Sequence, residues 1–264
     1  MGFHHLHHLY HLYHLHHPRN GMLGSMRIDA AIIGGTGIGS RLLDIPGKVV
    51  HVPTQYGFLR GRLLDIEGKS VLAMSRHSAG HKVPPHKVDY KAMAAAVKSL
   101  GARACFSTAA VGSLRPEWGC GTLVACSDFI DLTGRFPTLY DRAVVHTDFS
   151  EPFSARGHLL GAGEKVGVDI KDGGVYVCGN GPRYETPEEI GLYRQFGGDI
   201  VGMTAASEAI LMREAGVPYG CLAIVTNLAC GITDMPLNHE EVVDEMNRSG
   251  EVALRILSQA VATV

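Results

Sequence analysis

The sequence lacks the features that would direct the chain to a membrane or to a nucleic acid. None of its apolar runs approaches the roughly 20 residues that a membrane-spanning helix needs, and no signal peptide precedes Met26. Charged residues make up only 19% of the chain and the formal net charge is -2, which gives no reason to expect a basic surface. We therefore expect no nucleic-acid partner and no membrane partner.

Cysteine is scarce and follows no ligand pattern. The six cysteines stand at positions 105, 120, 126, 178, 221 and 230, with no CxxC pair and no zinc-like spacing. Isolated thiols of this kind usually behave as small buried hydrophobic side chains. The composition therefore predicts a reduced, cytoplasmic protein that holds no metal through these residues.

The first 25 residues lack the patterning of a folded protein. Residues 1–25 contain eight of the fifteen histidines and end just before a second methionine that could start the protein, Met26. A metal-binding tract is one interpretation. We adopt the other, an affinity tag with a linker, which is excluded from fold reasoning. The remaining residues, 26–264, are enough for one large domain or two small ones, and we expect one domain.

A glycine-rich stretch near the start, AAIIGGTGIGS at residues 30–40, lacks two phosphate-loop signatures. Ser40 replaces the third glycine of the dinucleotide fingerprint, the following helix is cut short at Pro46, and no acidic residue follows at the required distance. The GK[ST] of a P-loop is also missing. A tight structural turn would explain glycines alone. Thr36, a hydroxyl between two glycines, favours instead a small anion nest that suits a single phosphate.

Apolar stretches alternate with helical patterns along the rest of the chain. The predicted elements are, in order, a buried strand at 27–34, a hairpin at 58–77 turning at 67–69, a helix at 89–100, a strand from 102 that runs into a small-residue loop at 107–113, a helix at 186–197, a strand–turn–helix unit at 199–216, a strand at 218–231 and a long amphipathic helix from Asn238. This alternation predicts an α/β fold with a parallel or mixed sheet covered on both faces. Catalytic residues are then expected at the carboxyl ends of strands.

Several predicted strand ends carry anion ligands. Arg76 and His77 follow the hairpin, the loop at 107–113 offers backbone amides, and Thr204 begins a helix, where N–H groups and the dipole favour anions. An Arg–His pair alone is more often a solvated edge. Four such strand ends together, counting Thr36, indicate a pocket for inorganic phosphate.

The motifs now resemble one family. GGTG, RH, HKVDYKA, GSLR, EPF, GPRYETPEE, GMT, EAG and NHEEV occur in the order seen in the trimeric purine nucleoside phosphorylases, and the methylthioadenosine phosphorylase branch is the most similar. The resemblance covers the chain from Arg27 to the C-terminus. It implies phosphate-dependent cleavage of the N-glycosidic bond of a purine nucleoside, and a single α/β domain whose central mixed sheet forms a distorted barrel flanked by helices. It also implies a homotrimer.

The resemblance implies a set of phosphate contacts, with His77 also counted among the catalytic residues. These are Thr36, Arg76, His77, the backbone N–H of Ala110, and Thr204. Two positions depart from the family. Methylthioadenosine phosphorylases have Thr where this chain has Ala109, which implies one lost hydroxyl contact to phosphate. Ser207 stands where relatives often have Pro, and we expect little consequence.

The resemblance places four residues around the nucleoside: Met203 supports the ribose, Tyr184 stacks on the base, and Glu185 and Asn227 read the base edge. Core packing for Tyr184 and a favourable charge near a helix N-terminus for Glu185 are the alternatives.

Hydrogen-bond inventory decides which purine suits the pair. An ionised Glu185 only accepts, so it can take the N1–H of a 6-oxopurine but faces a lone pair on adenine N1. Asn227 can donate to O6 and accept from a protonating N7. Methylthioadenosine phosphorylases have Ser and Asp at these two positions. We therefore predict a 6-oxopurine substrate, since a mismatched base would leave buried groups unsatisfied.

The residues expected at the 5′ position are mixed. His146 precedes Glu151 as in methylthioadenosine phosphorylases, where a neighbouring subunit's His lines the alkylthio pocket, whereas His239 matches a His that binds the 5′-hydroxyl in purine nucleoside phosphorylases. Helix capping is the alternative for His239. We predict 5′-methylthioinosine as the substrate, giving hypoxanthine and 5-methylthioribose 1-phosphate. Methylthioadenosine, or inosine and guanosine, are the alternatives.

The predicted mechanism needs no metal and no organic cofactor, only inorganic phosphate as co-substrate. The C1′–N9 bond lengthens first, Asn227 stabilises charge at N7, Glu185 holds the base, and phosphate attacks C1′. A nucleoside-binding protein without catalysis and a nicotinamide-dependent oxidoreductase are the competing hypotheses. An intact phosphate site disfavours the first, and the broken glycine fingerprint disfavours the second.

Overall fold

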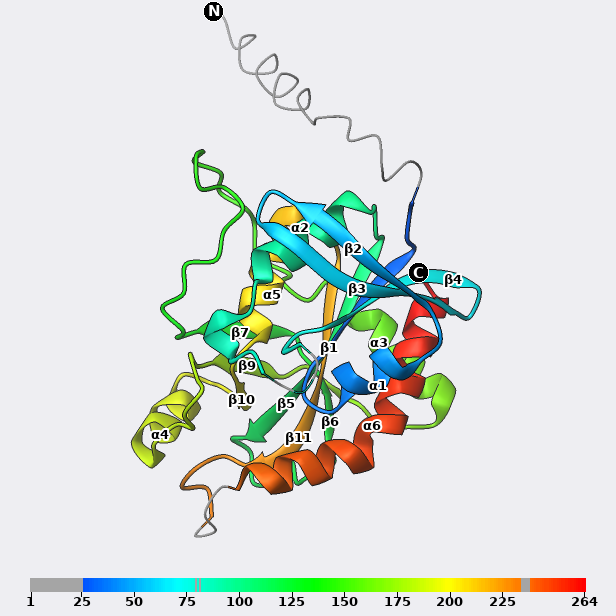
Figure 1. Cartoon of the computed structure of the whole chain (residues 1–264). Coiled ribbons are helices and arrows are strands. Elements are labelled where there is room, and N and C mark those ends of the chain that lie inside the picture. Colours follow the sequence, from blue (N-terminus) through cyan, green and yellow to red (C-terminus); the bar gives the residue numbers. More distant parts are fainter. Residues whose placement is uncertain (1–25, 79, 81, 234–237) are drawn as a thin grey trace, which may run out of the picture.

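The strands form one branched, mixed sheet of 11 strands. The computed structural model describes residues 26–78, 80, 82–233 and 238–264. Helices cover both faces of the sheet (Figure 1). The α/β fold predicted from the sequence, a mixed sheet flanked by helices, is confirmed. Residues 1–25, interpreted as a tag and linker, lie outside the described residues.

The strands are β1 Ala30–Gly34, β2 Lys48–Thr54, β3 Gly57–Ile66, β4 Lys69–Ser75, β5 Ala104–Ser113, β6 Leu123–Ala125, β7 Asp128–Asp131, β8 Lys171–Asp172, β9 Val175–Cys178, β10 Ile200–Gly202 and β11 Tyr219–Leu228. The α-helices are α1 Ile38–Asp44, α2 Tyr90–Ser99, α3 Arg156–Val166, α4 Pro187–Gln195, α5 Ala205–Ala215 and α6 His239–Ala262, and a 3-10 turn spans Pro85–Lys87. No helix of the described ranges is both long and apolar enough to cross a membrane.

The sheet branches at β5, which is long enough to pair with three strands. One edge of β5 runs parallel to β11 over almost its whole length, and the two strands pass together through the centre of the molecule (Figure 1). The other edge pairs in parallel with β1 up to Ser107, and antiparallel with β10 at Gly112 and Ser113. In the described chain, residues 108–111 therefore have no strand partner on that edge, and the sheet opens there.

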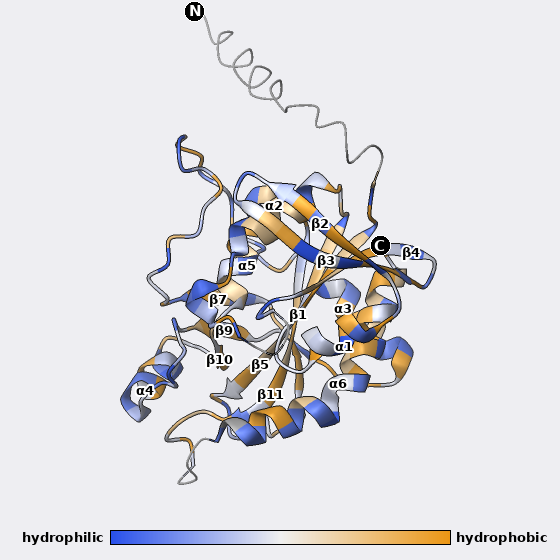
Figure 2. Ribbon diagram, in the orientation of Figure 1, coloured by the Kyte–Doolittle hydropathy of each residue, from blue (hydrophilic) through white to orange (hydrophobic). Residues whose placement is uncertain are grey.

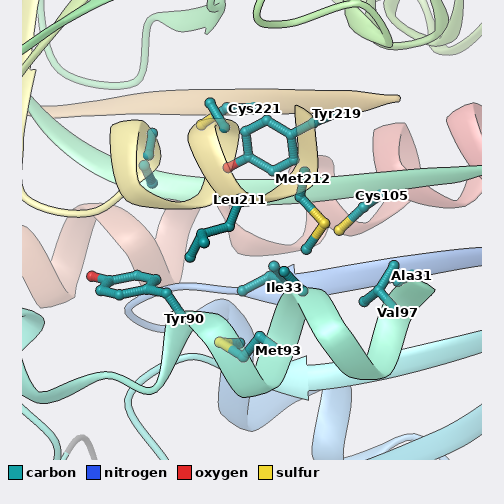
Figure 3. Close-up of a cluster of buried hydrophobic side chains, with 14 of the residues drawn as sticks. Ala31, Ile33, Tyr90, Met93, Val97, Cys105, Leu211, Met212, Tyr219 and Cys221 are labelled. Carbon is teal, nitrogen blue, oxygen red and sulfur yellow. The ribbon is translucent and has the colours of Figure 1, made fainter. Parts of the chain in front are cut away.

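Two layers of apolar side chains hold the helices against the sheet. One cluster joins α2 and α5 to one face through residues such as Met93 and Met212. The other joins α1, α3 and α6 to the opposite face through residues such as Leu42, Leu159 and Ile256. Figure 2 shows apolar residues concentrated in the central strands, with polar ones interleaved along α6. Figure 3 shows part of the first cluster, including the ring of Tyr219. Burial of these faces is the main force that stabilises the fold.

Local signals in the sequence set several helix ends. Asp89 caps α2 by accepting a hydrogen bond from the Ala92 N–H at 2.9 Å. Thr186 and Glu189 form a capping box at the start of α4. Gly216 ends α5 in the left-handed conformation, with φ of 73°. These helices begin and end where the sequence predicts, within one or two residues.

One predicted element is wrong. Residues 107–113 were expected to form a small-residue loop, but they continue β5. The reason is that the hydroxyls in this segment find partners inside the sheet: Ser107 Oγ lies 2.6 Å from the Tyr219 hydroxyl, and Thr108 Oγ1 accepts from the Gly35 N–H at 3.1 Å. The elements β2, β6, β7, β8, β9 and α3 are additions that the patterns did not indicate.

Candidate active site

A cavity of about 430 Å³ opens beside β5, next to the unpaired residues 108–111. Strands β1 and β4 run parallel to the first half of β5, whereas β9 and β10 run antiparallel to its second half. The carboxyl ends of these two sets of strands therefore point toward each other across the cavity. The volume lies within the range of sites that bind small molecules.

Ten of the residues singled out from the sequence line this one cavity. They are Thr36, Arg76, His77, Ala109, Ala110, Tyr184, Glu185, Met203, Thr204 and Asn227. They come from segments as far apart in sequence as β1 and β11, so the fold brings together what the sequence keeps separate. Their assigned roles stay predictions.

The two predicted 5′-pocket histidines are not among the lining residues. His146 is exposed on the long connection between β7 and α3. His239 is the first residue of α6, and its side chain lies outside the described parts of the chain.

Arg76 is the most firmly held charged residue of the site. Its side chain is almost completely buried, and its Nε and Nη2 donate to the two carboxylate oxygens of Glu208, the second at 2.9 Å. Nη1 donates to the Thr108 carbonyl oxygen at 2.9 Å. Burial alone would lower the pKa of Arg76, but the adjacent Glu208 carboxylate outweighs it and raises that pKa. The guanidinium is therefore a permanent cation in a fixed orientation.

Gly35 explains why the glycine loop stands next to this arginine. A Cβ at Gly35 would lie 2.6 Å from Arg76 Nη1 and 2.6 Å from the Thr108 oxygen that it binds. The same residue donates its N–H to Thr108 Oγ1. The second glycine of GGTG thus makes room for the arginine, in addition to the conformational freedom that the neighbouring Gly37 uses at φ of 72°.

The remaining phosphate candidates lie at the ends of β4 and β10. His77 is buried and its Nδ1 lies 2.8 Å from the Val83 carbonyl oxygen, so Nδ1 carries the proton. Thr204 is buried at the N-cap position of α5, and its hydroxyl makes no capping hydrogen bond to that helix. Its hydroxyl instead interacts with Tyr176, and the residue stands at a helix N-terminus, where anions are favoured.

Ala109 and Ala110 contribute backbone, not side-chain, polarity. Both line the cavity in the segment of β5 without a strand partner on that edge. Ala109 is buried and its side chain has no hydroxyl; the loss of a phosphate contact at this position stays a prediction. Ser207, the other departure, is fully buried and its Oγ accepts from Arg135 Nη1 at 3.4 Å, so this hydroxyl has a partner.

Asn227 lies at an irregularity in β11. The pairing of β11 with β5 shifts register between Val225 and Asn227, and both Thr226 and Asn227 line the cavity. The side-chain amide is held at both ends: Thr226 Oγ1 donates to Oδ1 at 3.0 Å, and Nδ2 donates to the Leu228 carbonyl oxygen at 3.0 Å. One Nδ2 proton and one Oδ1 lone pair remain for a ligand.

Tyr184 and Glu185 stand on the loop before α4, which a local clamp holds. Arg183 donates to both carboxylate oxygens of Glu189, at 2.8 and 2.7 Å. Hydrogen bonds from Arg183 and from the Thr186 N–H lower the pKa of Glu189 to about 2. The clamp therefore stays ionised at every pH at which the protein would be assayed.

Glu185 has the opposite environment. Burial in the cavity wall raises the pKa of its carboxyl group, and the nearby Glu189 carboxylate adds to the effect. Its Oε1 lies 2.7 Å from where a Cβ of Gly179 would stand, so a larger residue directly after β9 would displace the carboxyl group. A carboxyl group with a raised pKa in a cavity is typical of a functional site.

Sequence reasoning missed three features of the cavity. Val242 of α6 and Lys82 also line it, and Glu208 lies behind Arg76. A signal for Glu208 exists, since a charged residue in the apolar run AASEAILM is unusual and needs a buried partner. Within the described ranges, no group of three or more His, Cys, Asp or Glu is placed to hold a metal ion.

Known proteins resemble this chain over nearly its whole length. Residues 29–262 match the phosphorylase superfamily. A probable 6-oxopurine nucleoside phosphorylase of Moorella thermoacetica is 41% identical over 242 residues, 89% of this chain and 92% of the relative. A probable S-methyl-5′-thioinosine phosphorylase of Methanopyrus kandleri is 37% identical, over 88% of this chain and 91% of the relative. Methylthioadenosine phosphorylase from Schistosoma mansoni, solved with adenine, has a TM-score of 0.85 at 29% identity, covering 90% of this chain and 92% of that one.

Proposed function

Because the chain belongs to the phosphorylase superfamily and is a purine nucleoside phosphorylase, a pentosyltransferase, we propose that its substrates are 6-oxopurine nucleosides and that 5′-methylthioinosine is preferred. The observation that carries the proposal is that Glu185 and Asn227 line the same cavity as Arg76. The names of two relatives, a probable 6-oxopurine nucleoside phosphorylase and a probable S-methyl-5′-thioinosine phosphorylase, support the same substrate class.

The base site is proposed to lie around the end of β10. Asn227 Nδ2 lies 3.2 Å from where a Cβ of Gly112 would stand, on β5, and Glu185 Oε1 lies against Gly179, after β9. Strands β5 and β9 flank β10, so they are roughly 10 Å apart at the usual strand spacing. A flat bicyclic base fits between the two side chains, with Tyr184 as its stacking partner and Met203 beneath the ribose.

The donors and acceptors in this arrangement match a keto purine. The remaining N–H of Asn227 Nδ2 donates to O6, its Oδ1 accepts from N7–H, and the Glu185 carboxylate accepts from N1–H. Adenine offers the reverse pattern at positions 1 and 6, and would leave the Glu185 carboxylate facing a lone pair. Such mismatches in buried sites cost rate by factors on the order of 10⁴.

Phosphate is proposed to bind to Arg76, His77, Thr36, Thr204 and the backbone N–H of Ala110. In the proposed mechanism the glycosidic bond lengthens first, Asn227 stabilises the charge that develops on the purine, and a phosphate oxygen then bonds to C1′. Positioning phosphate beside C1′ supplies the entropic part of the rate enhancement. No organic cofactor enters these steps.

One apolar residue that lines the cavity supports the choice of a 5′-methylthio group. Val242 of α6 lines the cavity, so part of the wall formed by α6 is apolar. The second candidate, inosine, depends on His239 as a partner of a 5′-hydroxyl. The two histidines give mixed evidence, and the resemblance of the rest of the chain to the methylthioadenosine branch favours the methylthio group. His146 is proposed to line the cavity of a neighbouring subunit, as the family resemblance implies.

A homotrimer is part of the proposal. The connection that carries His146 also exposes Phe136 and Val144, which are 93% and 88% accessible. Large apolar side chains with such exposure typically mark an interaction surface. The cytoplasmic location inferred from the cysteine content stays a prediction.

The decisive test is kcat/KM for methylthioinosine, methylthioadenosine, inosine and adenosine at saturating phosphate. We expect each 6-oxopurine to exceed its 6-amino counterpart by at least about 100-fold, and Asn227→Asp to narrow that ratio. Equal or reversed preference in the unsubstituted protein would refute the substrate assignment. Nucleoside binding without phosphorolysis would favour a binding protein, and binding of a nicotinamide cofactor would favour an oxidoreductase.

A further inference from the structure

A buried carboxylate lies directly behind the proposed phosphate arginine. Glu208 is 2% exposed and stands in the first turn of α5, four residues after Thr204. Its partner Arg76 is 132 residues away in the sequence. A buried ion pair is costly to desolvate and is weak evidence for stability by itself. A role for Glu208 in the site is therefore the more informative explanation.

Glu208 occupies one of the two pairs of guanidinium nitrogens that can bind an oxyanion side by side, Nε and Nη2. Arg76 has five N–H donors. Nε and Nη2 each donate one to Glu208, and Nη1 donates one to the Thr108 carbonyl oxygen. Among the described residues, one N–H on Nη1 and one on Nη2 remain. These two N–H groups lie in one plane whose direction the other three bonds determine.

Two hydroxyls continue the network away from the cavity. The Tyr219 hydroxyl donates to Glu208 Oε2 at 2.6 Å, and Ser107 Oγ lies 2.6 Å from the Tyr219 oxygen. Tyr219 has one proton to give, so the Ser107 hydroxyl donates to Tyr219. Burial and the Glu208 charge both raise the pKa of Tyr219, which keeps that proton in place. All three side chains are at most 2% exposed.

The charge balance of the Arg76–Glu208 pair indicates that the pair orients hydrogen-bond donors toward phosphate more than it attracts phosphate by net charge. The Glu208 carboxylate cancels the charge of Arg76 at hydrogen-bond distance, so the pair offers a phosphate little net charge. What it does offer is two oriented N–H donors, the geometry that suits bidentate recognition of phosphate. Removing the Glu208 carboxylate would leave the site with a net positive charge but Arg76 less well oriented, and these two effects on phosphate affinity have opposite signs.

We propose that Ser107, Tyr219 and Glu208 form a positioning network that fixes the guanidinium of Arg76 and thereby sets the affinity for inorganic phosphate. The inference rests on the proposed phosphorolysis. Glu208 is a positioning residue here, because it contacts Arg76 and not the phosphate.

The test compares KM for phosphate with KM for the nucleoside. We expect Glu208→Gln to raise the phosphate KM at least about tenfold, since it removes a hydrogen bond to a charged group, with the nucleoside KM within about twofold. Glu208→Asp keeps the negative charge but is one methylene group shorter, so its carboxylate should no longer bind Arg76 at both oxygens. Its phosphate KM should therefore be similar to that of Glu208→Gln. Tyr219→Phe should raise the phosphate KM about three-fold in the same direction. Glu164→Gln and Tyr56→Phe, outside the network, are the matched controls.

Each outcome separates the inference from the proposed function. A lower phosphate KM in Glu208→Gln, or an Asp variant equal to the unsubstituted protein, would show a charge effect and overturn the positioning role. An equal rise in the phosphate KM and the nucleoside KM, together with a lower unfolding temperature, would show a merely structural role and would also overturn the positioning role. If Glu208→Gln does not fold, Tyr219→Phe decides on the same criteria. Absence of phosphorolysis in the unsubstituted protein would instead refute the proposed function.

Discussion

Replacing Gly35 by alanine tests the architecture of the phosphate site most directly. The added Cβ would lie 2.6 Å from both Arg76 Nη1 and the Thr108 carbonyl oxygen. Ordinary van der Waals contact begins near 3.4 Å, so the methyl group overlaps both partners by about 0.8 Å, a difference of those two distances. Thr108 belongs to β5 and cannot retreat without moving the sheet. Arg76 must therefore give way.

The size of the effect follows from the hydrogen bond that would break. The Nη1 bond to Thr108 is 2.9 Å long and is one of three that orient the guanidinium. Hydrogen bonds to charged groups contribute about 1.5–3 kcal/mol, and each 1.4 kcal/mol corresponds to a factor of ten. We therefore expect Gly35→Ala to raise the phosphate KM by a factor between about ten and 100. Overpacking should also lower the free energy of unfolding by about 1–3 kcal/mol.

The assay is phosphate-dependent release of hypoxanthine, with phosphate varied at saturating nucleoside. Gly161→Ala is the matched control, because nothing lies within 4 Å of its added Cβ and the residue is inside α3. Alanine is favoured over glycine in a helix by roughly 0.5–1 kcal/mol, so this control should be slightly more stable and equally active. A folded Gly35→Ala protein with an unchanged phosphate KM would refute the reasoning.

Further predictions concern the base site and the co-substrate. Because burial raises the pKa of Glu185 and only its ionised form accepts N1–H, kcat/KM for inosine should fall as the pH drops through a pKa above the ordinary value of about 4.3. A profile that stays flat down to that value would contradict the role, and Glu185→Gln should abolish this acid limb. Arg183→Ala removes the exposed clamp on Glu189. It should leave the unfolding temperature nearly unchanged, because exposed ion pairs contribute little to stability, but raise the nucleoside KM several-fold. An equal rise in the phosphate KM would argue against a local effect. Phosphate at 100 times its Kd should stabilise the protein by about 2.7 kcal/mol, seen as a higher unfolding temperature that chloride at equal ionic strength does not produce.

Much of the fold could be predicted because its signals are local. Strand β1 is a short apolar run, α4 begins with a capping box and α5 ends at Gly216, and each of these depends on residues within one turn. Helix α3 carries such a signal only at its end, where Gly167 adopts the left-handed conformation. Three glycines interrupt it and no side chain caps its start, so its stability comes from packing against α6 and β11. Tertiary contacts of this kind leave no periodic pattern in the sequence.

The candidate site also contains residues that the sequence indicates and residues that only the fold brings to it. The residues proposed to bind phosphate carry hydroxyl or guanidinium groups at predicted strand ends, which made Thr36 and Arg76 recognisable, whereas Asn227 followed from the family resemblance. Glu208 does not meet the ligand, and only folding brings it to Arg76. The segment 107–113 was misread for a related reason: its small residues suggest a loop, but their hydroxyls bind across the sheet to Tyr219 and Gly35.

The gap in strand pairing along one edge of β5 links phosphate binding to the stability of the sheet. Between Ser107 and Gly112 one edge of the central strand has no neighbouring strand within the described chain, and an unmatched backbone amide in an interior is expensive. An oxyanion bound there would accept hydrogen bonds from backbone N–H groups that have no strand partner. Binding of the co-substrate would then also stabilise this part of the sheet.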